Sequence, residues 1–239
     1  PALAGRVRAA FEEGRVTRAN FGLGLPAILG EEFTAELDAE ERRHAELYLF
    51  IEGTRHLRQR FALALDKEGI VVRGDAPWQD IVRQWAGFVA YGPELASYYH
   101  ACEVNLNVTS IQMPNTVNQR VFDCPAAGGF LLTDAQSDLA ALFDAEQETA
   151  VYTSPEDAVE QLRHYRAHPK ARTEMVAKAR KRILGEHTYV HRLTRIGEIV
   201  RGRFSDKIAK YENERGRGPK SGGGFNPPPG RRDDDGNHD

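Results

Sequence analysis

The segment over residues 118–134 constrains the fold of this chain more than any other stretch of its sequence. It combines a polar loop, a short helical pattern, the glycine pair Gly128-Gly129 and a buried apolar run that ends in an acid. In an α/β fold, such a join places polar side chains and backbone N–H groups where a nucleotide or a sugar phosphate can bind. The segment therefore predicts a fold class and a candidate binding site together.

Short apolar runs alternate with helical patterns along most of the chain. Runs rich in β-branched and aromatic residues predict buried strands over 70–74, 87–92, 103–108, 130–133 and 149–152. Apolar residues at helical spacing predict helices over 31–66, 95–102, 119–127, 138–143, 154–168, 169–184 and 188–203. This alternation, with short loops, predicts an α/β fold: a Rossmann-like, mostly parallel sheet with helices on both faces.

Several residues mark where the expected helices begin or are disturbed. Pro93 stands in the first turn of one helix, and Ser154-Pro155 followed by two acids predicts a capped start for another. Gly53 lies inside the long helix expected over residues 31–66. A glycine costs about 1 kcal/mol inside a helix, so we expect a break or a kink there.

Three regions are expected along the chain: a helical entry segment over residues 1–66, a Rossmann-like domain over 67–203, and a polar, mostly disordered tail over 204–239. The tail contains triplets of glycine, proline and aspartate and few apolar residues. Such a composition cannot build a core or a regular ladder.

Composition and charge narrow the functional classes. The formal net charge of −3 and the pI near 6.3 give no overall field for nucleic acid, so no nucleic-acid partner is expected. The two cysteines, Cys102 and Cys124, fit a reduced, cytoplasmic protein better than a disulfide scaffold. No apolar run reaches the roughly 18 residues of a membrane helix, so no transmembrane segment is expected.

Histidines occur four residues apart twice, as His164 with His168 and His187 with His191. Such pairs can bind a metal, but neither an HExxH motif nor a third ligand accompanies them. Surface or capping roles are therefore expected, and no metal is predicted. The chain also lacks the Walker, GxGxxG and G-x-S-x-G motifs of other nucleotide-binding and hydrolase sites.

Ligands of an open parallel sheet bind at the carboxyl ends of its strands. In this chain Gly92, Asn107 and Asp134 stand at or just after such ends, and a polar loop over residues 109–118 follows Asn107. Long loops in compact domains often carry function. The loop is rich in amide and hydroxyl groups, and its candidate ligands are Asn115, Thr116 and Asn118.

Arg120 and Asp123 belong to the helix that follows this loop. The planar guanidinium of Arg120 suits a pyrophosphate, and the carboxylate of Asp123 can accept both hydroxyls of a ribose. In the alternative interpretation, Asn118 only caps the helix and the other two form an i,i+3 surface pair, worth a few tenths of a kcal/mol. Gly128 and Gly129 also have two interpretations, a helix C-cap or close approach to a phosphate.

These ordered motifs resemble the CgeB-like family of spore-protein glycosyltransferase-like domains. The resemblance covers residues 67–203. It rests on residues 104–107, 118–123, 127–134, 139–143, 148–152 and 186–192.

The resemblance implies the C-terminal, donor-binding domain of a GT-B glycosyltransferase, which binds a nucleotide-diphosphate sugar and needs no cofactor. Retaining relatives carry a Glu-x7-Glu motif, with the second Glu at the donor ribose and the first beside the sugar. The matching positions are Asp123, which keeps the hydroxyl-accepting role, and Asn115, which carries no charge. The predicted catalytic residues are thus Asn115 and Asp123, and the predicted donor-binding residues are Gly92, Asn107, Thr116, Asn118, Arg120, Gly128 and Gly129.

The expected reaction is transfer of a hexose from the donor to an unknown protein or glycan acceptor. A GT-B site lies between two domains, so the resemblance also implies an upstream acceptor-binding domain, of which residues 1–66 would be a remnant. The competing interpretation is a non-catalytic interaction module that keeps the glycosyltransferase-like fold. It is motivated by the uncharged Asn115 and by the absence of a second domain from the 239 residues.

Overall fold

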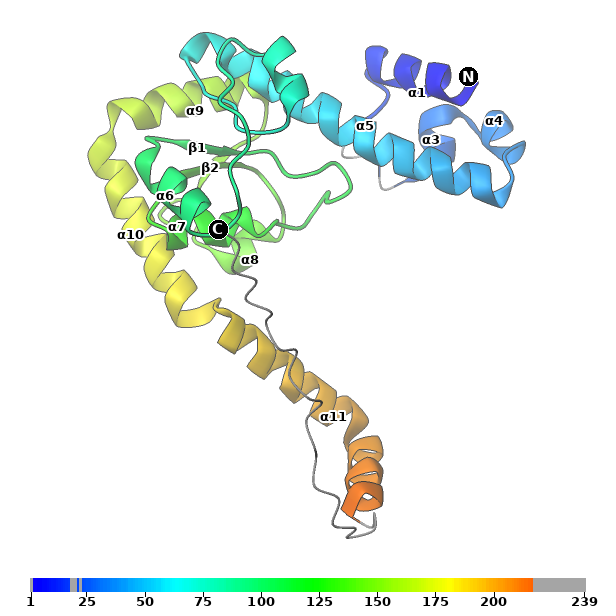
Figure 1. The fold of residues 1–239 in the computed structure, drawn as a ribbon, viewed down its shortest axis with the longest axis vertical. Coiled ribbons are helices and arrows are strands. Elements are labelled where there is room, and N and C mark those ends of the chain that lie inside the picture. The colour runs from blue at the N-terminus through cyan, green and yellow to red at the C-terminus, as the bar shows by residue number, and fades with distance from the viewer. Residues whose placement is uncertain (1, 18–20, 22, 217–239) are drawn as a thin grey trace, which may run out of the picture. The chain divides into compact units, whose positions relative to one another are not determined.

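The computed structural model describes residues 2–17, 21 and 23–216 of the chain (Figure 1). Two compact units divide the chain, Pro1–Thr188 and Tyr189–Asp239. The helices and strands of the first unit are α1 (Ala2–Glu12), α3 (Leu25–Leu29), α4 (Glu31–Ala35), α5 (Ala39–Leu65), the 3-10 helices η1 (Asp66–Glu68) and η2 (Ala76–Asp80), α6 (Pro93–Ala101), β1 (Asn105–Asn107), α7 (Arg120–Ala126), β2 (Leu131–Asp134), α8 (Leu139–Leu142), β3 (Ala150–Tyr152), α9 (Pro155–Ala167) and α10 (Pro169–Glu186).

The sheet has three parallel strands in the order β1-β2-β3. All four residues of the central strand β2 are buried. Leu132 packs in a core with residues of α5 and α9, whereas its neighbour Leu131 packs with residues of α6 and α7. Successive strand residues point to opposite faces, so helices cover both faces of the sheet. The predicted α/β class is therefore confirmed.

Two of the five expected strands are wrong, because residues 70–74 and 87–92 form no ladder in the described structure. The first run is paired only locally with residues 84–87: Val72 forms an isolated parallel bridge with Trp85, and the Gly74 N–H donates to the carbonyl oxygen of Gly87 at 3.0 Å. A parallel strand needs cover on both faces, whereas Phe88 is 76% exposed. The apolar composition of these runs therefore does not extend the sheet.

Two predicted helix starts are confirmed. α6 begins at Pro93, as its position in the first turn predicts. Ser154 caps α9, and its Oγ accepts the N–H of Asp157 at 3.1 Å.

The long helix expected over residues 31–66 is in fact two helices, α4 and α5. Asp38 begins α5 with a capping box, in which its carboxylate accepts two first-turn N–H groups and Glu41 accepts the Asp38 N–H at 3.0 Å. Gly53 does not break α5, contrary to expectation. A Cβ at Gly53 would lie 3.1 Å from Cγ2 of Ile111, so the glycine lets the loop after β1 pack closely against the helix.

α5 contributes to two hydrophobic cores. Its first half packs with α1 and α3 through Ala45 and Leu49. Its second half packs on the sheet through Phe61 and Leu65, and the ring of Phe61 lies 4.9 Å from that of Tyr152. The helix thereby connects the N-terminal helices to the sheet.

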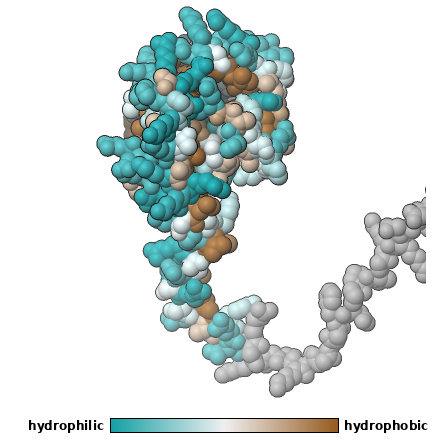
Figure 2. All heavy atoms as spheres, turned by 90° about the vertical axis from the view of Figure 1, so that its left-hand side faces the viewer, coloured by the Kyte–Doolittle hydropathy of each residue, from teal (hydrophilic) through white to brown (hydrophobic). Residues whose placement is uncertain are grey.

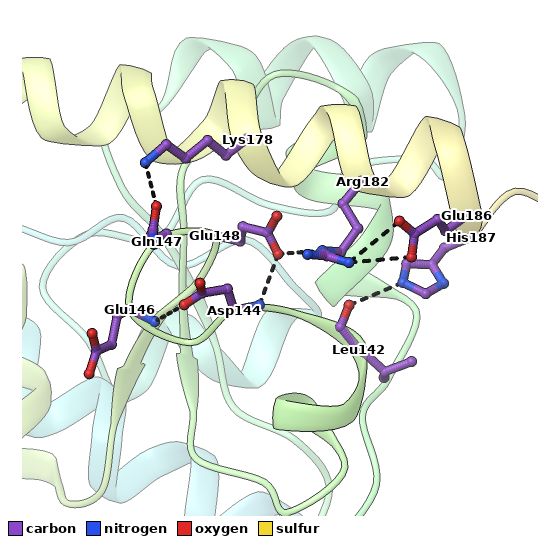
Figure 3. Close-up of polar contacts among 9 residues, drawn as sticks. All are labelled: Leu142, Asp144, Glu146, Gln147, Glu148, Lys178, Arg182, Glu186 and His187. Atoms are coloured by element: carbon purple, nitrogen blue, oxygen red, sulfur yellow. Dashed lines mark hydrogen bonds and ion pairs between the residues drawn. The ribbon is translucent and has the colours of Figure 1, made fainter.

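The end of α10 is held to the turn before β3 by a polar network (Figure 3). Arg182 forms ion pairs with Glu148 at 2.5 Å and with Glu186 at 3.3 Å. His187 follows directly, with its Nε2 3.1 Å from the carbonyl oxygen of Leu142. His187 therefore contributes to packing between elements.

The described part of the second unit is α11 (Tyr189–Gly216). Its backbone leaves the helical region at Phe204, where φ is −126° and ψ is 23°. The division between the units falls after Thr188, ahead of the last helix that the sequence assigns to the Rossmann-like domain. α11 continues into the first part of the expected tail, and residues 217–239 of that tail lie outside the described residues.

Candidate functional site

The carboxyl ends of β1 and β2 are joined by buried polar side chains. Asn107 donates from Nδ2 to Oγ1 of Thr133 at 2.9 Å. Thr109 donates its N–H and its hydroxyl to Oδ1 of Asp134, at 3.0 and 2.9 Å. All four residues are at most 3% exposed. The edge of the sheet is therefore a hydrogen-bonded platform, since buried polar groups require such partners.

Asn107 and Asn118 exchange hydrogen bonds between their amides, at 3.2 and 3.0 Å. Oδ1 of Asn107 also accepts Nη1 of Arg120 at 2.7 Å, and Oδ1 of Asn118 accepts the Arg120 N–H at 3.2 Å. Arg120 is thus held at the start of α7 by two amides. Asn107 is completely buried, and its contacts make it a positioning residue for Arg120. Its direct contact with the donor stays a prediction.

Asp123 lies one turn along α7 and has a different partner. Its Oδ2 accepts the hydroxyl of Tyr91 at 2.9 Å. Gly92, with φ of 120°, directly follows Tyr91 and precedes α6. Arg120 and Asp123 therefore engage separate neighbours, in place of the i,i+3 surface pair of the alternative interpretation.

Asn115 and Thr116 lie in the exposed part of the loop between β1 and α7. The carbonyl oxygen of Asn115 accepts the N–H of Asp138 at 2.9 Å and the hydroxyl of Ser137 at 3.2 Å. The backbone of Asn115 thus fastens the loop to the segment before α8, while its side chain remains exposed.

Gly128 and Gly129 lie at the other end of α7, before β2, and the structure does not bring them together with Asn118 and Arg120. Gly128 has a φ of 87°, which suits the end of a helix. A Cβ at Gly129 would come within 2.6 Å of the carbonyl oxygen of Tyr99. Chain geometry and close packing account for both glycines, and their role beside a phosphate stays a prediction.

Arg58 reaches the carboxyl edge from α5 and was not among the predicted site residues. Its Nη2 lies 3.3 Å from Oγ of Ser110, in the loop after β1. Burial lowers the pKa of the Arg58 guanidinium; the positive charge of Arg120 lowers it further, and the negative charge of Asp134 opposes the shift. The edge thus combines two guanidinium groups with one buried carboxylate, a balance that favours an anionic ligand.

The position of Arg58 in the sequence could have identified it as a site residue. Thr54, Arg58, Phe61 and Leu65 recur at spacings of four, three and four and so share one helix face. The other three are buried. An arginine within a buried stripe needs a polar environment, which here is the end of the sheet.

Gln136 is a second residue that the sequence did not single out. It is 7% exposed, and its Nε2 donates to Oδ2 of Asp134 at 2.7 Å. Its Oε1 is buried and has no hydrogen-bond partner within the described part of the chain. The amide thus fixes Asp134 and leaves one acceptor for a water or ligand donor.

The histidine pair His164–His168 and the thiol of Cys124 have packing roles. His164 and His168 stack at 4.4 Å, and the residues that the structure describes contain no group of three or more potential metal-ligating side chains. Burial raises the pKa of the Cys124 thiol, which makes it a poor nucleophile at neutral pH. No helix among the described residues has the length and apolar character needed to cross a membrane.

Comparison with known proteins gives a family and a fold. Sucrose-phosphate synthase from Thermosynechococcus elongatus, a GT-B glycosyltransferase, is similar in structure with a TM-score of 0.52 and 15% sequence identity. The similarity covers 62% of this chain and 42% of the synthase chain. No curated protein matches the chain. A family model described as glycosyl transferase-like matches residues 49–198, more than half of the sequence, and the chain belongs to that family.

Proposed function

We propose that this chain is the donor-binding half of a GT-B glycosyltransferase and binds a nucleotide-diphosphate sugar at the carboxyl edge of its sheet. The observation that carries the proposal is the placement of Arg120, which Asn107 and Asn118 hold at the start of α7. Arg58 adds a second guanidinium near it. Paired guanidinium groups match the charge and geometry of a diphosphate.

Each polar group at the edge has a distinct proposed role. Arg120 and Arg58 bind the diphosphate, and Asp123 accepts the ribose hydroxyls in place of, or together with, the hydroxyl of Tyr91. The exposed loop residues Asn115 and Thr116 and the half-buried Asn118 lie near the sugar. Asn115 stands at the position of the first Glu in the Glu-x7-Glu motif of retaining relatives.

Catalysis in this scheme is electrostatic. As the bond between the sugar and the diphosphate breaks, negative charge grows on the leaving diphosphate, and the two guanidinium groups stabilise it. We propose transfer of a hexose to a protein or glycan acceptor, and a closer kinship with CgeB-like members of the family. A second domain would bind the acceptor, as the GT-B architecture implies.

Isothermal titration with UDP, GDP and their sugars tests the binding step. We expect one nucleoside diphosphate to bind, and Arg120→Ala or Asp123→Ala to weaken it by at least about tenfold, the effect of losing about 1.4 kcal/mol. Arg58→Ala should weaken binding as well. The matched control is Arg180→Ala, because Arg180 donates to the Ala126 carbonyl at the opposite end of α7. Absence of heat with every nucleotide, or an equal loss in the control, would refute the proposal.

A non-catalytic interaction module remains the second candidate. It is favoured by Asn115, whose side chain cannot act as an acid or base and whose carbonyl is engaged by Ser137 and Asp138. The two candidates differ in turnover. Hydrolysis or transfer from a bound sugar nucleotide supports the enzyme, whereas binding with no turnover of any donor supports the module.

A further inference from the structure

α11 carries an apolar stripe along one side, which the irregular backbone at Phe204 interrupts. Successive helix residues are rotated by about 100°, so residues spaced by three and four positions share a face. The stripe shows as apolar side chains along α11 in the lower part of Figure 2. Its members are between 41% and 82% exposed: Tyr189, Val190, Leu193, Ile196, Val200, Phe204 and Tyr211.

Basic residues accompany this stripe. Residues 189–213 contain six Lys and Arg against three Asp and Glu, although the whole chain has a net charge of −3. Arg192 and Arg203 fall along the same edge of the stripe by their spacing, whereas Glu198 falls on the far side of the helix. The helix is therefore amphipathic and basic in an acidic protein.

The pattern argues against pairing of α11 with a second copy of itself. The stripe is broad, since Val190 and Phe204 widen it beyond the narrow two-position seam of a coiled coil. In an antiparallel pair, the edge that carries Arg192 and Arg203 would also face its own copy, and like charges repel. A surface that offers both apolar groups and negative charge would match the apolar stripe and the basic edge together.

We propose that α11 binds to the surface of an anionic lipid membrane. The helix would lie in the plane of the interface, with Leu193, Ile196 and Val200 among the acyl chains and the basic edge at the phosphate groups. Tyr189 and Tyr211, near the two ends of the stripe, would sit at headgroup level. This mode differs from spanning the bilayer, for which no described helix is suited.

Co-sedimentation of the full chain with vesicles tests the proposal. We expect binding to phosphatidylcholine vesicles that contain about one quarter phosphatidylglycerol, and weaker binding to phosphatidylcholine alone, because each basic residue near an anionic surface contributes about 1 kcal/mol. Raising the salt from about 0.1 M to about 1 M should release the protein, since the Debye length falls from about 10 to about 3 Å.

Leu193→Glu should lower the partition coefficient at least about tenfold, because a charge replaces a leucine that membrane binding would bury among the acyl chains. The matched control is Leu184→Glu on α10, where the leucine is 54% exposed, and it should bind as wild type. Arg192→Glu/Arg203→Glu keeps the stripe and should lose the preference for phosphatidylglycerol. Circular dichroism checks that each variant is folded.

Three outcomes overturn the proposal: no binding above that to phosphatidylcholine alone, equal losses in Leu184→Glu and Leu193→Glu, or an unchanged lipid preference after charge reversal. A concentration-dependent dimer that Leu193→Glu dissociates, without vesicle binding, would assign the stripe to a second copy instead. Nucleotide binding is measured separately, so these outcomes leave the donor-site proposal unaffected.

Discussion

Asn107 illustrates how a single buried side chain organises the candidate site. Its amide bonds to Asn118, Arg120 and Thr133, which come from three different segments. The sequence predicted the chemical value of Asn118 and Arg120 from their place after a strand. It did not predict that Asn107 would be wholly buried, because burial depends on the loop that folds over it.

Removal of the Asn107 amide is expected to weaken both the fold and the site. Asn107→Ala removes the hydrogen bonds that the amide makes with Thr133, Asn118 and Arg120, and an unsatisfied buried polar group costs about 1–3 kcal/mol. Urea denaturation should show this loss, and nucleotide affinity should fall with it. Asn115→Ala, at an exposed position of the neighbouring loop, should change the unfolding free energy by less than about 0.5 kcal/mol. Equal stability of the two variants would contradict the positioning role.

Close packing around Gly129 predicts that a side chain at this position destabilises the fold. A Cβ there would meet the Tyr99 carbonyl oxygen at 2.6 Å and Sγ of Cys124 at 2.9 Å, so Gly129→Ala should lower the free energy of unfolding by more than about 2 kcal/mol. Gly185→Ala in α10 meets no atom within 4 Å and should stabilise by up to about 1 kcal/mol through helix propensity. Thermal unfolding of both variants compares the two signs.

At the scale of elements, local sequence patterns predicted the helix starts, whereas the tertiary environment decided which apolar runs became strands. Helix starts at Pro93 and Ser154 follow from local chemistry, and the sequence predicted them. The expected strands over 70–74 and 87–92 failed because the run that contains Phe88 is not covered on both faces. Covering a strand is a property of the elements around it, so a short apolar run cannot specify it alone.

The contact between α9 and the segment after α5 predicts that part of the stability of the fold depends on pH. Glu68 accepts two hydrogen bonds from Arg163, at 3.0 and 2.6 Å, and these lower the pKa of Glu68. A lowered folded-state pKa stabilises above the unfolded pKa of about 4.3, and the contribution is lost as pH falls through the folded value. Glu68→Gln should therefore be less stable than wild type at pH 7, and the difference should shrink as the pH falls below about 4. Glu160→Gln, on the exposed side of α9, serves as the control.

At the scale of the whole molecule, the first unit contains two cores that share α5. Leu49 belongs to the core of the N-terminal helices and Leu132 to that of the sheet. Sharing a single helix permits the two cores to open separately, as cooperative units of different stability. We therefore expect the candidate site at the sheet to depend little on packing in α1 and α3.

Hydrogen exchange measured by mass spectrometry tests this independence. Leu49→Ala removes a side chain that is 1% exposed, at a cost of about 2–5 kcal/mol to its own core. We expect faster exchange in α1 and α3 and unchanged protection in β2. Leu132→Ala should accelerate exchange in β2. Uniform acceleration over both cores after Leu49→Ala would show that they form one cooperative unit.

The sequence by itself determined the α/β class, the three central strands and the chemistry of Asn118, Arg120 and Asp123. These features follow from local periodicity and from side chains next to strand ends, which act over a few residues. Only the tertiary structure placed Arg58 beside Arg120, buried Asn107 and brought the Tyr99 backbone against Gly129. Each of these depends on segments that are distant in sequence and meet in the fold, as when α5 packs across the sheet and brings a guanidinium to its carboxyl edge.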